Sequence, residues 1–271
     1  MNLFFKLLYF LQGEMNEPKP FGWFHLMWII SAILILIVLY KTKSEKKLKL
    51  ILGIYGLTAL ILEILKQLIW SFNYENGIIT WDYQWYAFPF QLCTTPIYIS
   101  ILCLFLKESK IRNALLSYMA YITILGSFMT AILPSSCFTS DILVNIHTMW
   151  LHFGSLVVSI YLLMKNIVKI DKNNLKNAFI VFIGFVIFAS FLNIFIYNIG
   201  ILNGEEFNMF YISPYFISSL SVYDIIQQNV PYIIYLLLHI LSIFIGSLII
   251  YFIFYTTKKV IYENIRNKEI N

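Results

Sequence analysis

Charged residues are scarce in this 271-residue sequence: they make up 12% of it, against about 25% in an average soluble domain. Hydrophobic residues make up 60%. This composition excludes a soluble enzyme and a disordered chain. The same composition excludes a disulfide-rich secreted domain. The odd count of three cysteines excludes a fully paired disulfide framework, although one bridge from Cys137 stays open. The net charge of +5 comes from short basic clusters between apolar runs, so we expect no nucleic-acid partner.

Long apolar runs fill most of the chain. A bilayer core about 30 Å thick requires roughly 20 apolar residues in a helix, and the runs lack the alternation of a membrane-spanning β-strand. The sequence therefore predicts an all-α polytopic membrane protein, a bundle of seven transmembrane helices in the cell membrane. The predicted spans lie near residues 24–40, 50–72, 88–106, 114–133, 147–164, 178–201 and 231–257.

The loops predict the orientation of the bundle. Cytoplasmic loops of membrane proteins are enriched in Lys and Arg. We therefore expect the N-terminus outside and the C-terminus in the cytoplasm. The basic residues are concentrated in every second connecting segment, at 41–49, 107–112, 165–176 and 258–268.

The chain divides into three segments on this topology. Residues 1–20 form an outer segment, in which MNLFFKLLYFLQG is too short and too interrupted, at Lys6, for a signal peptide, so we expect a short interfacial helix. Residues 21–258 form the seven-helix membrane domain. Residues 259–271 form a basic cytoplasmic tail.

Ionisable side chains inside the predicted spans are the first candidates for function, because each is costly to bury in lipid. Glu63 and Lys66 lie three residues apart in the second span, on one helix face, where they are expected to pair. This spacing is equally typical of a neutralised structural pair and of a functional site.

The third span opens on the segment Phe88-Pro89-Phe90-Gln91-Leu92-Cys93-Thr94-Thr95-Pro96. Pro89 suits the first turn of a helix. Pro96 is expected in the helix interior, where it removes a hydrogen bond and introduces a kink. Cys93 then lies near a helix N-terminus, which favours a thiolate. A cysteine in an apolar helix is more often inert packing, which is how we interpret Cys103.

Histidine and asparagine supply further polar groups. His147 and His152 are about 140° apart around the fifth span, so they are not expected to share one face. His239 in the seventh span and Asn193 in the sixth are compatible with ordinary hydrogen bonds between helices.

The polar groups gather in the outer half of the predicted bundle. Counting residues from the outer ends of the spans places Cys93 and His152 at a similar depth. The inner half has almost no ionisable residues, whereas a pore or proton relay needs polar groups along its whole length. This arrangement favours a site that opens to the outer leaflet or to the outer water.

The segment from Phe88 to Cys93, with Glu63 in the preceding helix and His152 in a later one, resembles YwaF-type integral membrane proteins. These are bacterial relatives of the eukaryotic transmembrane protein 164 family. Gln91 is a departure, because many relatives have His at this position.

A second matching segment runs from Asn208 to Tyr211 and is followed by Pro214 and by Pro231-Tyr232. The resemblance extends from about His25 to the last helix.

The resemblance implies a lipid acyltransferase, because the eukaryotic relatives are regarded as membrane acyltransferases. It implies that Cys93 forms an acyl thioester and that His152 is the base, with membrane phospholipids or lysophospholipids as partners. We expect no cofactor and no metal, and the oligomeric state is open. The supporting candidates are Glu63, Lys66, Gln91, His239, Asn193, Asn208 and Tyr211.

Other functions stay open. A transporter or binding protein for a lipid or small molecule, without catalysis, would use the same outer cluster as a ligand site. A retinal protein is excluded because the last span has no lysine near its middle. A metal site is a weaker alternative, because the spacing of its candidate ligands matches no compact zinc motif; these ligands are His147, His152, His239 and Cys93.

Overall fold

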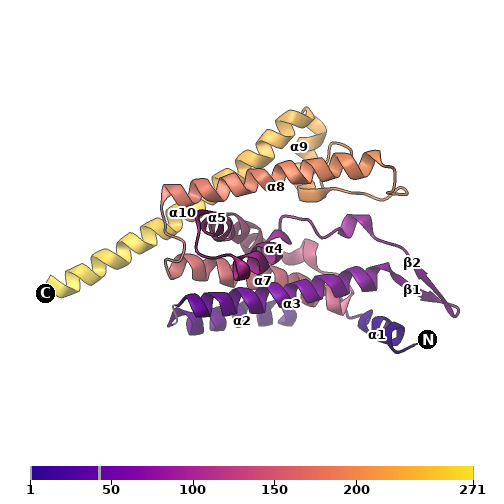
Figure 1. Cartoon of the computed structure of the whole chain (residues 1–271), viewed down its shortest axis with the longest axis horizontal. Helices are drawn as coiled ribbons and strands as arrows, with labels where there is room; N and C mark the ends of the chain where they lie inside the picture. The colour runs from indigo at the N-terminus through magenta and orange to yellow at the C-terminus, as the bar shows by residue number, and fades with distance from the viewer. Residues whose placement is uncertain (1, 42–43, 271) are drawn as a thin grey trace.

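The long apolar runs form helices that lie roughly along the longest dimension of the molecule (Figure 1). The computed structural model describes residues 2–41 and 44–270, so Lys43 of the first basic cluster lies outside the described residues. Six described helical stretches are long and apolar enough to cross a membrane. They are α2 (Trp23–Tyr40), α3 (Glu45–Ser71), the continuous stretch of α5 (Lys110–Tyr118), η2 (Met119–Thr123) and α6 (Ile124–Ile132), α7 (Ile142–Met164), α8 (Lys172–Asn198) and α10 (Tyr232–Ile270).

The third predicted span differs from the others. Its helix, α4, covers only Thr95–Phe105, which is about 16 Å at 1.5 Å per residue and too short to cross the bilayer core alone. Residues 88–94 are not helical. The chain is thus an all-α, multi-pass membrane protein in which one apolar run is only half helical.

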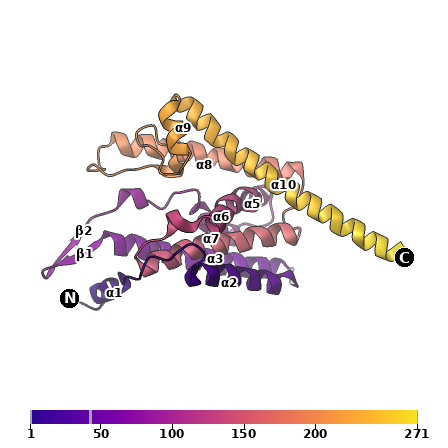
Figure 2. The same cartoon turned by 180° about the vertical axis from the view of Figure 1, so that it is seen from behind.

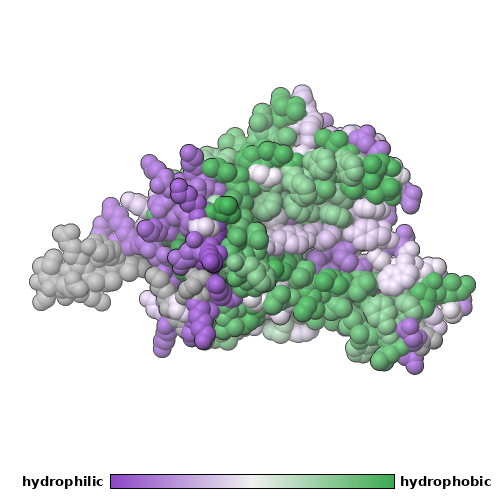
Figure 3. Space-filling view, viewed as in Figure 1, coloured by the Kyte–Doolittle hydropathy of each residue, from purple (hydrophilic) through white to green (hydrophobic). Residues whose placement is uncertain are grey.

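The two ends of the molecule differ in structure. Near the N-terminus lie α1 (Leu3–Leu11) and the hairpin of β1 (Phe72–Glu75) and β2 (Ile78–Trp81), whereas α9 (Tyr223–Asn229) packs against α10 (Figures 1 and 2). The C-terminus lies at the opposite end. Hydrophilic residues gather at that end, beside a broad apolar surface (Figure 3). The helix predicted within residues 1–20 is confirmed as α1.

The core is centred on α7, whose most apolar stretch is 67% buried, against 17% for α2. α7 packs against α2, α3 and α6. Its Gly154 has no side chain because a Cβ there would lie 2.7 Å from the Tyr55 ring of α3. The Tyr55 hydroxyl donates to the carbonyl of Leu151, at 3.2 Å. This close approach fixes the separation of α3 and α7, the two helices that carry Glu63, Lys66, His147 and His152.

Candidate functional site

The third apolar run breaks where Cys93 lies. α4 begins at Thr95 and has Pro96 in its first turn, because proline lacks the N–H that this position leaves unpaired. The expectations that the helix starts near Pro89 and that Pro96 kinks its interior are therefore wrong. Before the helix, the Thr94 hydroxyl lies 2.9 Å from both the backbone N–H and the carbonyl of Gln91, which closes a turn around Cys93.

A cavity of about 460 Å³ lies against this break. Its walls come from α3, α7, the 86–94 segment and the loop that follows α8. Irregular backbone at membrane depth is tolerated where it is buried in protein or lines a cavity. The residues that line it are Lys66, Trp70, Tyr86, Ala87, Phe88, Gln91, Cys93, Thr94, Val144, His147, Thr148, Leu151, His152, Glu206, Asn208, Tyr211, Ile217 and Ser219.

Six of the sequence-predicted residues line this one cavity, although they come from four separate segments. Cys93 and His152 face the same space but form no hydrogen bond with each other in the described part of the chain. The six are Lys66, Gln91, Cys93, His152, Asn208 and Tyr211.

His147 and His152 both line the cavity, contrary to the expectation from their angular separation. The cavity extends around α7 and takes in Val144, Thr148 and Leu151 as well. Two side chains about 140° apart around a helix do not both contact one neighbouring helix. Both can still line a cavity that extends around the helix. From the sequence, His147 is a candidate only as a ligand of the alternative metal site, so its place beside Glu63 in this cavity was missed.

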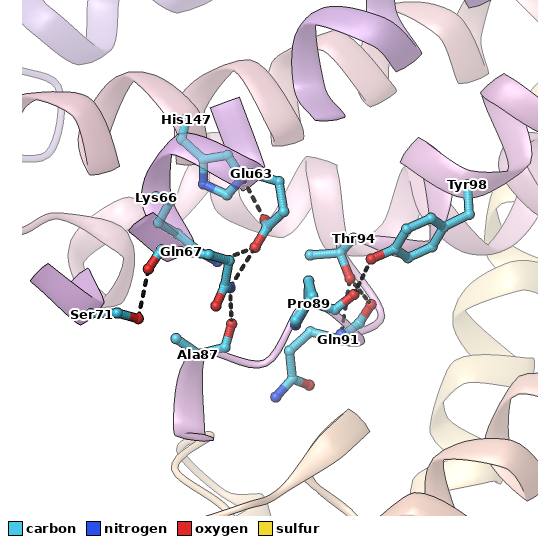
Figure 4. A network of polar contacts seen from close by, with 10 residues as sticks. All are labelled: Glu63, Lys66, Gln67, Ser71, Ala87, Pro89, Gln91, Thr94, Tyr98 and His147. Carbon is cyan, nitrogen blue, oxygen red and sulfur yellow. Dashed lines mark hydrogen bonds and ion pairs between the residues drawn. The ribbon is translucent and has the colours of Figure 1, made fainter. Parts of the chain in front are cut away.

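Glu63 lies beside the cavity at the centre of a polar network (Figure 4). Its Oε1 is 2.7 Å from Lys66 Nζ, which confirms the predicted pair, and it accepts a hydrogen bond from Gln67 Nε2 at 2.8 Å. Its Oε2 is 2.8 Å from His147 Nε2. Glu63 is only 2% exposed, and an ionised carboxylate at such a site needs partners of this kind.

The same network extends to the 86–94 segment, which precedes α4 and contains the non-helical part of the third apolar run. Gln67 also donates to the Ala87 carbonyl, at 2.6 Å, and accepts from Ser71 Oγ through its own backbone carbonyl, at 2.8 Å (Figure 4). The pair of Glu63 and Lys66 is therefore connected through one amide to the chain that leads to Cys93.

Two amide side chains fasten the loop that closes the other side of the cavity. Gln91 donates to the Asn208 carbonyl at 2.9 Å and accepts from the Phe210 N–H at 2.8 Å. Asn193 of α8 makes the same kind of double contact with Met209, at 3.0 and 2.7 Å. Phe210 and Tyr211 both have a φ of +59°, a left-handed conformation that is costly for such residues. The amide contacts hold the loop in this shape.

Besides Glu63, two predicted supporting residues do not line the cavity. Asn193 is fully buried and acts through the loop just described. His239 of α10 packs against the rings of Tyr223 and Tyr235, with centroids 4.9 and 6.2 Å away. Neither lines the cavity.

Two phenols outside the predicted spans add hydroxyl groups to the cavity. Burial raises the pKa of Tyr211. Burial also raises the pKa of Tyr86, and the carboxylates of Glu205 and Asp141 raise it further. Both side chains are therefore neutral hydrogen-bond donors at physiological pH. Tyr86 was missed because it lies among the aromatic residues of segment 81–88, a composition that is also typical of the aromatic belt at a membrane interface.

Among residues 2–41 and 44–270, no three His, Cys, Asp or Glu side chains are grouped so as to hold a metal ion. The ionisable and phenolic groups that line the cavity are a thiol, two imidazoles, an ammonium group, the carboxylate of Glu206 and two phenols.

Comparison with known proteins identifies the family. The TMEM164 family profile matches residues 20–254, which is most of the chain. The chain belongs to the TMEM164 family. This confirms the predicted relation to the transmembrane protein 164 family, and the matched region contains every residue of the cavity. No curated protein and no solved structure matched the chain.

Proposed function

We propose that this TMEM164-family chain is a membrane-embedded lipid acyltransferase of the cell membrane, with Cys93 as the nucleophile and His152 as the base. The observation that carries the proposal is that Cys93, at a break in an apolar run, lines the same cavity as His152. The partners are membrane phospholipids or lysophospholipids.

The reaction has two balanced steps. His152 takes the Cys93 thiol proton, the sulfur attacks the ester carbonyl of a phospholipid, and the ester C–O bond breaks as the leaving oxygen takes the proton. This gives an acyl thioester and a lysophospholipid. In the second step the hydroxyl of an acceptor attacks the thioester, and the thiol is regained.

Tyr211 is the proposed donor to the oxyanion of these steps. Its hydroxyl makes no hydrogen bond within the described structure and lines the cavity. The Asn193 amide is occupied by Met209, and the Asn208 amide lies 3.3 Å from the carbonyls of Phe216 and Ile217. A donor that stabilises an oxyanion must be available when the charge forms.

An acyl-enzyme assay tests the proposal. The full chain is incubated in vesicles that contain acyl-labelled phosphatidylethanolamine and phosphatidylglycerol, and the protein is examined for a hydroxylamine-sensitive adduct. We expect an adduct in the wild type and in Cys103→Ala, and none in Cys93→Ala. His152→Asn should form it far more slowly than His239→Asn, whose histidine lies outside the cavity. A wild type without adduct, or an adduct that survives in Cys93→Ala, would refute the proposal.

A membrane protein that binds or transports a lipid or small molecule without catalysis is the second candidate. It is favoured by the lack of a hydrogen bond between Cys93 and His152 and by the charged pair of Glu63 and Lys66 beside the cavity. Uptake into proteoliposomes that is lost in Glu63→Gln but kept in Cys93→Ala would support this function over acyl transfer.

The proposed topology has seven crossings, in which residues 88–94 and α4 together make the third. The N-terminus is outside, the C-terminus is in the cytoplasm, and the cavity opens in the outer half of the bilayer. In a chain without its native cysteines, a membrane-impermeant maleimide applied to intact cells should label Asn76→Cys in the hairpin and leave Lys259→Cys unlabelled. The opposite labelling would invert the topology and move the site to the inner leaflet.

A further inference from the structure

The Glu63 carboxylate fixes the protonation pattern of its neighbours. An ionised carboxylate only accepts hydrogen bonds. Oε1 faces the ammonium of Lys66 and the amide N–H of Gln67, and Oε2 faces Nε2 of His147 (Figure 4). The contact between Oε2 and Nε2 has the distance of an ion pair without the angles of a hydrogen bond. We assign the hydrogen of His147 to Nε2 because an ionised carboxylate attracts a nitrogen at this distance only through a hydrogen.

Lys66 supplies the counter-charge of Glu63. Its ammonium already balances the Glu63 carboxylate at 2.7 Å, so the buried group is neutral when His147 is neutral. A neutral imidazole with a hydrogen on Nε2 has a free lone pair on Nδ1. The contacts of Glu63 thus select one tautomer, in which Nδ1 is a proton acceptor.

That acceptor has no partner within the described structure. His147 is 3% exposed and lines the cavity, and its Nδ1 is buried without a hydrogen bond. A buried polar atom without a partner is unfavourable. A hydroxyl group of a ligand in the cavity would satisfy it once the imidazole turns toward that space, because Nδ1 itself is covered in this conformation.

His147 and His152 occupy two levels of the cavity. Five residues along α7 separate them by about 7.5 Å along the helix axis. His147 lies closer to the start of α7 at Ile142, the end near the N-terminus of the chain (Figure 1). In a two-step acyl transfer, one of two imidazoles at different depths can serve the attack on the donor ester, and the other can serve the acceptor hydroxyl.

We propose that His147 is a further catalytic residue, the base for the acyl acceptor, and that Glu63 is its positioning residue. The inference rests on the proposed acyltransferase function. The hydroxyl proton of the acceptor moves to Nδ1 of His147 as its oxygen bonds to the thioester carbonyl carbon. The C–S bond to Cys93 breaks, and the proton then passes to the thiolate, which restores the thiol and the neutral imidazole.

The test separates the two steps of the reaction. The full chain in vesicles first receives the acyl-labelled lipids, and then lysophosphatidylethanolamine and lysophosphatidylglycerol as acceptors. His147→Gln should form the acyl-enzyme but transfer its acyl group on the order of 10²–10⁴-fold more slowly, the usual contribution of a general base. His239→Gln is the matched control, because it also removes a buried histidine with an unpaired Nδ1, and it should transfer at the wild-type rate.

The outcomes distinguish the two proposals. If the wild type forms no acyl-enzyme, the acyltransferase function fails, and this inference fails with it. If the wild type forms the adduct and His147→Gln transfers it at the wild-type rate, only the inference is overturned. Unchanged labelling of Cys93 by a maleimide in His147→Gln shows that the cavity is still folded.

A second measurement tests the role of Glu63 without any substrate. Nitrogen NMR of the histidine-labelled chain should show the His147 tautomer with its proton on Nε2. The double variant Glu63→Gln/Lys66→Met removes both charges together and so leaves no unpaired ion. In this variant the tautomer preference should be lost and transfer should slow, with acyl-enzyme formation retained. A proton on Nδ1 in the wild type would overturn the inference.

Discussion

Two cavities lie on neighbouring faces of α7, and they have opposite character. The candidate site is lined by a cysteine, two histidines and a lysine, and much of its wall is irregular backbone. The second cavity, of about 390 Å³, lies between α2, α3 and α7 and is walled only by regular helices. Its lining is mostly aliphatic and aromatic: Trp28, Ser31, Ala32, Ile35, Leu39, Ile51, Ile54, Tyr55, Trp150, Phe153, Gly154, Val157 and Val158.

This contrast shows where the chain departs from the simplest membrane protein. Regular helices satisfy their own backbone, so an apolar wall needs no polar side chains. A broken span leaves N–H and C=O groups that need partners, which Gln67, Gln91 and Asn193 supply around the candidate site. Polar side chains therefore occur around the irregular backbone of the candidate site, and the reactive side chains lie in the same region.

The largest effect is expected from breaking the Glu63 network. Glu63→Ala leaves Lys66 as a buried charge without its carboxylate and should lower the free energy of unfolding by about 3–5 kcal/mol. Thermal unfolding in detergent measures this. The double variant Glu63→Gln/Lys66→Met should recover most of the loss. Equal destabilisation of the single and double variants would show that the ion pair is not what matters.

Gln91 should have the next largest effect, because it fastens irregular backbone. Gln91→Ala removes two hydrogen bonds, to the Asn208 carbonyl and from the Phe210 N–H. The expected loss is about 2 kcal/mol of unfolding free energy, since an unsatisfied buried group costs roughly 1–3 kcal/mol. Gln84→Ala is the control and should be nearly neutral, because this half-buried amide makes one side-chain hydrogen bond among the described residues, to the Asp82 carbonyl two residues away. Similar losses in the two variants would contradict a special role for Gln91.

Much of the fold follows from the sequence, because length and hydropathy are enough to define a membrane helix. The runs at 24–40 and 147–164 correspond to α2 and α7 with shifts of a few residues. The apolar run at 88–106 was predicted to be one helix, but residues 88–94 are irregular. An irregular segment that is buried in protein carries side chains as apolar as those of a membrane helix, so hydropathy does not distinguish the two. Pro96 was assigned to a helix interior when it marks the beginning of α4.

The candidate site is only partly predictable for a related reason. Cys93 and His152 stand out as reactive groups at similar depth, and both line the cavity. The contact between Glu63 and His147 joins residues that are far apart in the sequence, and nothing in the spacing of either residue indicates it. The clamp of Gln91 on the 208–210 loop is likewise a tertiary contact that local patterns do not encode.

A bulky side chain introduced into either cavity tests which of the two leads to Cys93, and it leaves the reactive groups unchanged. Thr148→Phe narrows the candidate site, and Val157→Phe narrows the second cavity. In a chain with Cys103→Ala and Cys137→Ala, a lipophilic maleimide should label Cys93 about tenfold more slowly in Thr148→Phe, a barrier increase of roughly 1.4 kcal/mol. Val157→Phe should not change this rate. Slower labelling in both variants would mean that lipophilic compounds reach Cys93 through the second cavity.

The last comparison is between two of the three tryptophans that line the cavities, Trp70 and Trp28. Trp70 in the candidate site donates from Nε1 to Asp141 Oδ2 at 3.1 Å, whereas Trp28 in the second cavity has a buried Nε1 without a partner in the described structure. Trp→Phe removes similar volume at both positions, but only Trp70→Phe loses a hydrogen bond to a charged group, worth about 1.5–3 kcal/mol. Trp28→Phe should therefore lower the free energy of unfolding by less than Trp70→Phe, and by about 1 kcal/mol at most, because removing an unpaired N–H offsets part of the lost packing. Thermal unfolding of the two variants side by side measures the difference. A larger loss in Trp28→Phe would show that the second cavity holds a polar partner for this indole and is not the inert counterpart of the first.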